Sequence, residues 1–364
     1  MNKINVTKPV LPPLEEFIPL LENIWENRIL SNNGPMHQEL EVSLCSRFDW
    51  AYASLVNNGH FALEIALKVL NVKNGGEVIT TPFTFVSTVA AIVNQGYVPV
   101  FCDIKEDFTI DASQIESLVT EKTVAIVPVH VYGFPCDVEE IQRIANKHDL
   151  KVIYDAAHAL GVQYKGKDIA SYGNMSMFSF HATKLFHTIE GGVIICADKE
   201  TKIKIDQTKN FGISDPESVA FVGMNAKMNE MQAAMGLSLL PYFDEIVAAR
   251  KMIFERYAQN LNGLPEVKIN LPDDDTKHNY AYMPILIIDK RDIVYDVLES
   301  ENIHARKYFH PLISDFECYK EYVRSNSLRN AQCTASNVLS LPIYPSLNLR
   351  EVDFICNVIR KAIA

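Results

Sequence analysis

Two side chains stand out because each follows a short apolar segment and both could reach one site. Lys184 comes a few residues after the apolar stretch 175–180, and Asp155 ends the apolar run Val-Ile-Tyr-Asp. An amine and a carboxylate are two of the groups that hold pyridoxal 5′-phosphate: the lysine forms a Schiff base with the aldehyde, and the carboxylate keeps the pyridine nitrogen protonated. We therefore predict catalytic roles for both residues in an enzyme that transfers amino groups.

Each of these two residues also has an ordinary structural reading. Lys184 could be one of many surface lysines, although its neighbours Phe178, Phe180, Leu185 and Phe186 favour a desolvated, reactive amine. Asp155 could equally be the N-cap of a helix that follows the strand.

A phosphate group needs a cradle of backbone amides, and residues 57–60 offer one. The sequence Asn57-Asn58-Gly59-His60 precedes a segment, 61–70, with helical apolar spacing. A glycine turn that leads into a helix presents free amides and the positive end of the helix dipole. Asn-Gly turns before helices are common, so this signal is weak alone. Ser179 could add a hydroxyl.

The flat cofactor ring needs a stacking partner and a contact for its hydroxyl. Phe85 could stack on the pyridine, although Phe83 and Phe85 could both be core residues. His158 could contact the ring hydroxyl, and its alternative is a structural histidine. The order of these candidates along the chain carries more weight than any one of them.

Length and composition favour a two-domain α/β enzyme. The chain has 364 residues, 48% of them hydrophobic, and a net charge of −11. An acidic chain is a poor binder of nucleic acid or of membrane surfaces, and no segment predicts a signal peptide or a membrane span. The seven cysteines are scattered, without a metal-binding pattern, so we expect no metal and a cytoplasmic location.

Strand-like and helix-like segments alternate between residues 55 and 200. Because alternating strands and helices build parallel sheets, we expect a largely parallel sheet covered by helices, with ligands beyond the carboxyl ends of its strands. We expect a large domain over residues 1–244, including an N-terminal segment on the surface, and a small C-terminal α/β domain over 245–364. A long helix over 228–258 would link them, followed by a strand over 280–288 and a helix over 293–302. The expected strands of the large domain cover 77–81, 98–103, 124–129, 151–155, 175–180 and 193–197, and a further helix covers 138–148.

Several motifs together resemble one family, the DegT/DnrJ/EryC1/StrS group of pyridoxal-phosphate-dependent aminotransferases that act on nucleotide-linked keto-sugars. The likeness covers nearly the whole chain. The motifs are residues 58–63, 82–88, 128–133, 155–161, 178–192, 223–233 and 304–311.

The resemblance implies the aspartate-aminotransferase-like fold (PLP fold type I) and a homodimer with shared active sites. It makes Lys184 the Schiff-base lysine, Asp155 the pyridinium partner and Phe85 the stacking ring. It also implies cofactor contacts from Gly59, His60, His158 and Ser179, and from Asn225 of the other subunit. Substrate contacts are implied for His181, Lys227, Tyr308 and His310.

Three positions depart from the common pattern of the family. His60 replaces a frequent threonine, which removes one hydroxyl from the phosphate site. His158 stands where glutamine is common, and Lys227 stands where arginine is common, which weakens a bidentate contact there.

The resemblance implies a two-stage transfer of an amino group from L-glutamate to a sugar ketone. The segments His181-Ala-Thr-Lys184 and Glu190-Gly191-Gly192 look more like members that aminate C4 than like those that aminate C3. We therefore expect dTDP-4-keto-6-deoxy-D-glucose to give dTDP-4-amino-4,6-dideoxyglucose, a precursor of surface polysaccharide such as O-antigen. C3 amination, a galacto product and UDP- or GDP-linked sugars are alternatives.

Two other functional classes compete with this reading. A nucleotide-dependent oxidoreductase is disfavoured, because no Gly-x-Gly-x-x-Gly follows a strand. A non-catalytic, ligand-binding regulatory homologue could keep the fold, but an intact Lys184 and Asp155 argue against it.

Overall fold

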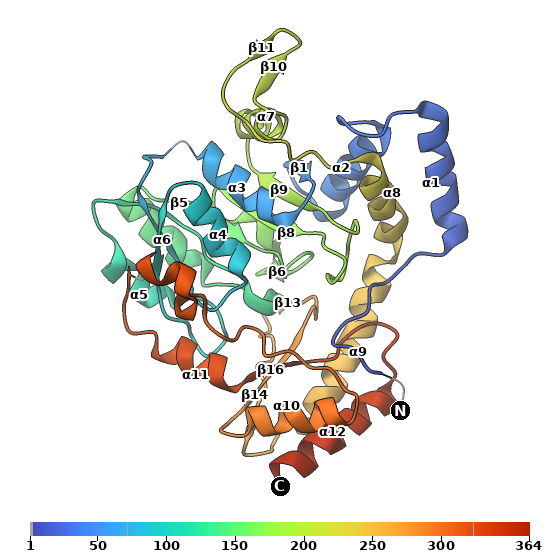
Figure 1. Cartoon of the computed structure of the whole chain (residues 1–364), viewed down its shortest axis with the longest axis vertical. Coiled ribbons are helices and arrows are strands. Elements are labelled where there is room, and N and C mark those ends of the chain that lie inside the picture. Colours follow the sequence, from blue (N-terminus) through green and yellow to red (C-terminus); the bar gives the residue numbers. More distant parts are fainter. Residues whose placement is uncertain (1–2, 71, 323) are drawn as a thin grey trace.

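An eight-stranded sheet forms the centre of the protein, which a computed structural model describes for residues 3–70, 72–322 and 324–364 (Figure 1). The strand order is β1-β9-β8-β5-β4-β2-β3-β15. Only β9 runs antiparallel to its neighbours, so the prediction of a largely parallel sheet is confirmed. The strands are β1 (Tyr52–Val56), β2 (Glu77–Thr80), β3 (Val98–Phe101), β4 (Thr123–Ile126), β5 (Lys151–Asp155), β8 (Met175–Ser179), β9 (Gly192–Cys196) and β15 (Arg324–Ser325).

Helices cover both faces of this sheet because its strands are apolar on both sides. In β5, Val152 and Tyr154 join one buried cluster, whereas Ile153 between them joins another. Alternate residues of a strand point to opposite faces, so the two clusters lie on opposite sides. The first contains residues of α2 (Pro35–Phe48), α5 (Ala112–Leu118), α6 (Val138–His148) and α8 (Glu230–Leu239). The second contains residues of α3 (Gly59–Val69), α4 (Val86–Asn94) and α7 (Lys199–Thr208).

The C-terminal part of the chain builds a separate hydrophobic cluster. Its sheet has the order β12-β14-β16, and the N-terminal Ile4 joins it through a bridge to Ile303. The predicted boundary at 244/245 falls in the first turn of α9, whose early residue Ile246 packs in the first cluster and whose later residue Ile253 packs in this one. The boundary itself stays a prediction. The elements of this cluster are α9 (Phe243–Leu261), β12 (Val267–Lys268), β14 (Met283–Ile287), α10 (Arg291–Ser300), β16 (Val338–Leu341) and α12 (Leu349–Ile363). The helix α11 (Arg329–Asn337) packs instead in a cluster that contains Phe83.

The expected single helix over 228–258 is wrong. A 3-10 turn at Leu240–Tyr242 separates α8 from α9. Pro241 lies in this turn, and a proline cannot donate the backbone hydrogen bond that a continuous helix requires there.

Two other sequence expectations also need correction. The N-terminal segment lies on the surface as expected around α1 (Leu14–Asn27), of which only Ile24 is buried, but the helix itself was not predicted there. The strand expected over 280–288 begins at Met283, because Tyr280 has a left-handed backbone with φ of 54°.

Short elements complete the fold. A hairpin made of β10 (Ile213–Asp215) and β11 (Ser218–Val219) projects from the body of the protein in Figure 1. A small sheet pairs β6 (Gln163–Tyr164), β7 (Lys167–Asp168) and β13 (Thr276–Lys277). Across the described residues, no helix has the length and apolar character needed to cross a membrane.

Candidate active site

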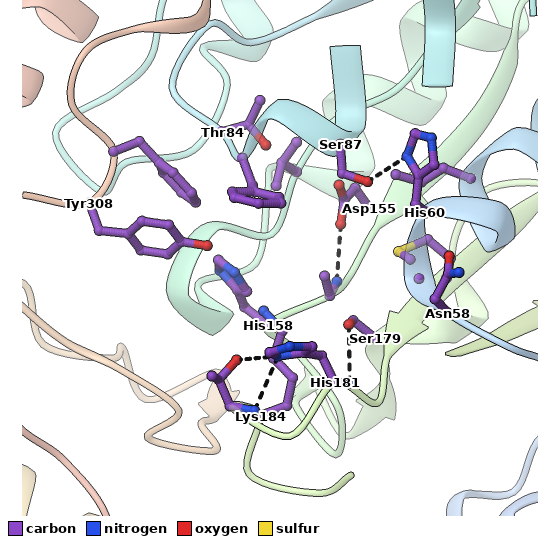
Figure 2. Close-up of a pocket in the computed structure, with 18 of the residues that line it drawn as sticks. Asn58, His60, Thr84, Ser87, Asp155, His158, Ser179, His181, Lys184 and Tyr308 are labelled. Carbon is purple, nitrogen blue, oxygen red and sulfur yellow. Dashed lines mark hydrogen bonds between the residues drawn. The ribbon is translucent and has the colours of Figure 1, made fainter. Parts of the chain in front are cut away.

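A cavity of about 470 Å³ opens where the carboxyl ends of β1, β2, β5 and β8 meet (Figure 2). The loops after these strands and the first turns of α3 and α4 supply most of its wall. Residues from the C-terminal part of the chain close one side. The lining residues are Asn58, Gly59, His60, Leu63, Thr84, Phe85, Ser87, Val129, Asp155, Ala157, His158, Met177, Ser179, His181, Thr183, Lys184, Glu190, Arg306, Tyr308 and Phe309.

Asp155 places a buried carboxylate at the cavity wall. It is only 5% exposed, and it accepts hydrogen bonds from Thr88 Oγ1 at 2.7 Å and from the backbone N–H of Ala157 at 3.1 Å. Burial raises the pKa of Asp155, while these hydrogen bonds and the charge of Lys184 act against that rise. Residues 156–162 form turns and no helix, so the alternative reading of Asp155 as a helix N-cap is wrong.

Lys184 enters the same cavity from the loop that follows β8. Its Nζ donates to the hydroxyl of Tyr282 at 3.1 Å and lies 5.6 Å from the centre of that ring. The loop is fixed because Leu185 and Phe186 are buried in the core and because Thr188 N–H donates to the carbonyl of Phe180. The buried residues after Lys184 and the hydrogen bond between Thr188 and Phe180 therefore fix the backbone that carries the amine.

His158 presents one nitrogen to a fixed partner. Its Nδ1 accepts the backbone N–H of Tyr132 at 3.0 Å, so the neutral ring carries its proton on Nε2. Burial and then the charge of Lys184 hold the pKa of His158 well below its usual value. The side chain is therefore a neutral N–H donor that lines the cavity.

The first turn of α3 forms the anion-binding end of the cavity. Asn58 caps this helix by accepting the N–H of Phe61 at 2.8 Å. Gly59 allows the turn to approach β8 closely, since an added Cβ would lie 3.0 Å from Ser179 Cβ and 3.1 Å from its Oγ. Free amides at a helix N-terminus beside a serine hydroxyl suit a phosphate group.

The two candidate phenylalanines have different environments. Phe83 is fully buried and packs in a core cluster. Phe85 is 53% exposed and lines the cavity. Its ring centre lies 6.4 Å from that of Tyr308. Phe85 is therefore available to stack on a planar ligand.

The remaining predicted contacts divide into two groups. His181 and Tyr308 line the cavity, and His181 is held by Thr183 Oγ1 at 2.7 Å. Asn225, Lys227 and His310 do not line it. Lys227 Nζ donates to Asn225 Oδ1 at 2.9 Å, outside this cavity, and His310 is exposed. The roles of these three residues stay predictions.

Sequence reasoning missed several residues that the fold brings to the site. Ser87 and Thr88 lie in the first turn of α4, within the motif 82–88, and their hydroxyls could have been suspected there. Tyr282 and Arg306 come from the C-terminal part of the chain. Arg306 lies within the motif 304–311 and could have been suspected there, whereas no local pattern marks Tyr282. In the described part of the chain, no group of three or more His, Cys, Asp or Glu side chains is arranged to hold a metal ion.

Known proteins resemble this chain over its whole length. A transaminase of Shigella dysenteriae, dTDP-4-amino-4,6-dideoxy-D-glucose transaminase, is 45% identical over 363 residues, which cover 98% of each chain. A protein of the same name from Escherichia coli is 46% identical over 95% of each chain. The crystal structure of DesI with its TDP-sugar product superposes with a TM-score of 0.94 at 31% identity, covering 100% of this chain and 94% of DesI. The model of the DegT/DnrJ/EryC1/StrS aminotransferase family matches residues 14–360, and the chain therefore belongs to that family.

Proposed function

We propose that this aminotransferase converts dTDP-4-keto-6-deoxy-D-glucose to dTDP-4-amino-4,6-dideoxy-D-glucose, with L-glutamate as the amino donor. The two transaminases that are 45% and 46% identical over almost the whole chain support this choice of sugar. The single observation that carries the chemistry is the arrangement of Lys184, Asp155 and His158 around one cavity.

The cofactor is pyridoxal 5′-phosphate, which supplies an electron sink for the carbon that exchanges its proton. The cavity residues fit this group. The buried carboxylate of Asp155 would face the pyridinium nitrogen, and the N–H of His158 would face the ring hydroxyl. Gly59, Ser179 and the amides of α3 would hold the phosphate, and Phe85 would cover the ring.

Lys184 is assigned the proton transfers. As a free amine it would remain hydrogen-bonded to Tyr282, which keeps Nζ inside the cavity. A general base held in this way contributes roughly 10²–10⁴-fold to the rate. We assign Nζ of Lys184 to move the proton at the sugar carbon that receives the amine.

Arg306 offers a cation for an anionic part of either substrate. Its guanidinium lies 5.7 Å from the ring centre of Tyr308 at the cavity wall. Among the described residues it forms no ion pair with a carboxylate. A carboxylate of glutamate or the diphosphate of the sugar nucleotide would suit it.

We further propose a homodimer in which the hairpin region completes the partner's site. Asn225 and Lys227 follow the projecting β10–β11 hairpin (Figure 1) and lie outside their own cavity. Near the hairpin, Val219 is 64% exposed and Val222 is 82% exposed. Apolar side chains on a projecting arm are typical of a surface that another chain covers. A cytoplasmic location and a role in surface polysaccharide synthesis stay predictions.

The proposed reaction is tested with a panel of keto-sugars linked to dTDP, UDP or GDP, each incubated with the protein and L-glutamate. Mass spectrometry detects the aminated product and NMR locates the amine. We expect the dTDP-linked 4-keto sugar to give the C4 amine in the gluco configuration. Preference for another nucleotide, or an amine on C3, would replace the substrate assignment. No aminated sugar from any member would favour a regulatory homologue.

Replacing Asp155 by asparagine should stabilise the cofactor-free protein and lower the activity of the enzyme. Burial raises the pKa of Asp155, so its ionisation removes stability as pH rises through that pKa. At pH 7, Asp155→Asn should therefore raise the melting temperature of the cofactor-free protein. The same change should lower kcat by roughly 10–100-fold, because the partner of the pyridinium loses its charge.

Asp168→Asn is the matched control for this experiment. Burial also raises the pKa of Asp168, which accepts from Trp50 Nε1 at 3.0 Å and lies outside the cavity. It should change the melting temperature and leave kcat within about twofold. Full activity in Asp155→Asn would contradict the assignment of Asp155.

Val222→Asp tests the shared site. A charge at this exposed position should weaken subunit association, because burying an unpaired carboxylate is unfavourable. We expect a shift from dimer to monomer in sedimentation velocity and weaker cofactor binding. Ile293→Asp, on α10 and 55% exposed, is the control and should remain dimeric. A wild-type protein that is monomeric, yet fully active, would rule out the dimer proposal.

A further inference from the structure

A line of three side chains runs from the anion-binding end of the cavity into the protein. His60 Nδ1 lies 2.9 Å from Ser87 Oγ, and its Nε2 lies 3.0 Å from Glu64 Oε1. His60 and Ser87 line the cavity, whereas Glu64 lies behind them. Figure 2 shows the contact between His60 and Ser87.

Glu64 is a buried carboxylate with a complete set of donors. It is 5% exposed and accepts from Asn94 Nδ2 at 2.7 Å and Gln95 Nε2 at 3.3 Å, in addition to His60. Burial opposes the ionisation of Glu64, but these hydrogen bonds outweigh it and lower the pKa of the carboxyl. The far end of the line is therefore an anion that only accepts hydrogen bonds.

This anion determines how His60 can contact Ser87. Because the carboxylate accepts, Nε2 of His60 must carry a hydrogen. With a neutral ring, Nδ1 then accepts the hydroxyl hydrogen of Ser87, which leaves no hydrogen for a ligand. With a protonated ring, Nδ1–H donates to Ser87 Oγ, and the hydroxyl hydrogen is free to point into the cavity.

A phosphate dianion in the cavity favours the second arrangement. His60 would then lie between two anions, the phosphate and Glu64, and opposite charges on both sides stabilise an imidazolium. The other titratable or charged side chains along the wall are Asp155, His158, His181, Lys184, Glu190, Arg306 and Tyr308. Of these, Asp155 bonds to Thr88, His158 to Tyr132 and His181 to Thr183.

We propose that Glu64 and His60 are positioning residues for the cofactor's phosphate. When the phosphate binds, His60 takes one proton from solvent, Glu64 remains ionised, and the hydroxyl of Ser87 turns to donate to a phosphate oxygen. No covalent bond forms or breaks. The hydroxyl that a threonine at position 60 would supply is thereby replaced by one from α4. This inference rests on the assignment of this end of the cavity to the phosphate.

The test compares binding of pyridoxal 5′-phosphate with binding of pyridoxal, which lacks the phosphate, to the full-length cofactor-free protein. Glu64→Gln keeps an acceptor for His60 and removes the charge. It should raise the Kd for pyridoxal 5′-phosphate by roughly 10–100-fold and change the Kd for pyridoxal by less than about threefold. His60→Gln should behave alike, and Ser87→Ala should raise the phosphate-dependent Kd by roughly 3–10-fold.

A double variant separates positioning from general support of the fold. His60→Thr places a hydroxyl directly at the phosphate and removes the line, so adding Glu64→Gln to it should have no further effect on the ratio of the two Kd values. Glu139→Gln, an exposed carboxylate paired with Lys165, is the control and should leave that ratio unchanged. Melting curves of each cofactor-free variant identify any variant that fails to fold. If Glu64→Gln fails to fold, the Kd values of His60→Gln and Ser87→Ala test the proposal instead.

Equal loss of affinity for both ligands in Glu64→Gln and His60→Gln would overturn the inference, because it would mean a structural role alone. Unchanged affinity for both ligands would overturn it as well. A wild-type protein that binds pyridoxal as tightly as pyridoxal 5′-phosphate would instead refute the phosphate site itself, which distinguishes the two failures.

Discussion

The site depends on holding the carboxylate of Asp155 in a buried wall, where its charge is unfavourable without a positive partner. Within the described part of the chain, two hydrogen bonds, from Thr88 and Ala157, support the carboxylate, and burial raises its pKa. Thr88 is itself positioned by Thr84 at 2.8 Å. A cationic ring nitrogen opposite Asp155 would remove the electrostatic penalty, so the same feature that destabilises the cofactor-free protein favours binding of the cofactor.

The sheet gives the cavity two electrostatically different ends. Asp155 ends β5 and presents negative charge, whereas the first turn of α3 follows β1 and presents backbone amides. A ligand with a cationic ring and an anionic tail can therefore bind in one orientation only. Lys184, after β8, and Phe85, before α4, line the same cavity, so a single edge of the sheet orients the ligand and supplies the reactive amine.

Local sequence patterns predicted the parts of the site that follow strands. Asp155, Lys184, Gly59 and His158 each lie just beyond an apolar segment, and the carboxyl ends of parallel strands meet at one edge. The family motifs added the aspartate-aminotransferase-like fold and the substrate, whereas Lys184 and Asp155 had already indicated the cofactor. The antiparallel direction of β9 could not be predicted from its apolar pattern, because buried strands look alike in either direction.

Other features depend on contacts between distant segments. Tyr282 reaches Lys184 across 98 positions of the chain, and Arg306 reaches the cavity from beyond α10, so no periodicity marks them. Pro241 indicates a break between α8 and α9. The apolar pattern on both sides of this proline is nevertheless typical of one continuous helix, so the break was not predicted from the sequence. Glu64 follows His60 by four residues on α3, a spacing that the sequence shows, whereas the contact of His60 with Ser87 depends on the packing of α3 against α4.

The most direct test of the account is reduction of the cofactor-loaded protein with borohydride, followed by peptide mapping. We predict a stable pyridoxyl label on Lys184 in the peptide that contains residues 179–192, with loss of the absorbance near ~410–430 nm that the lysine–cofactor link gives. A label on another lysine, or a protein that takes up none, would contradict it.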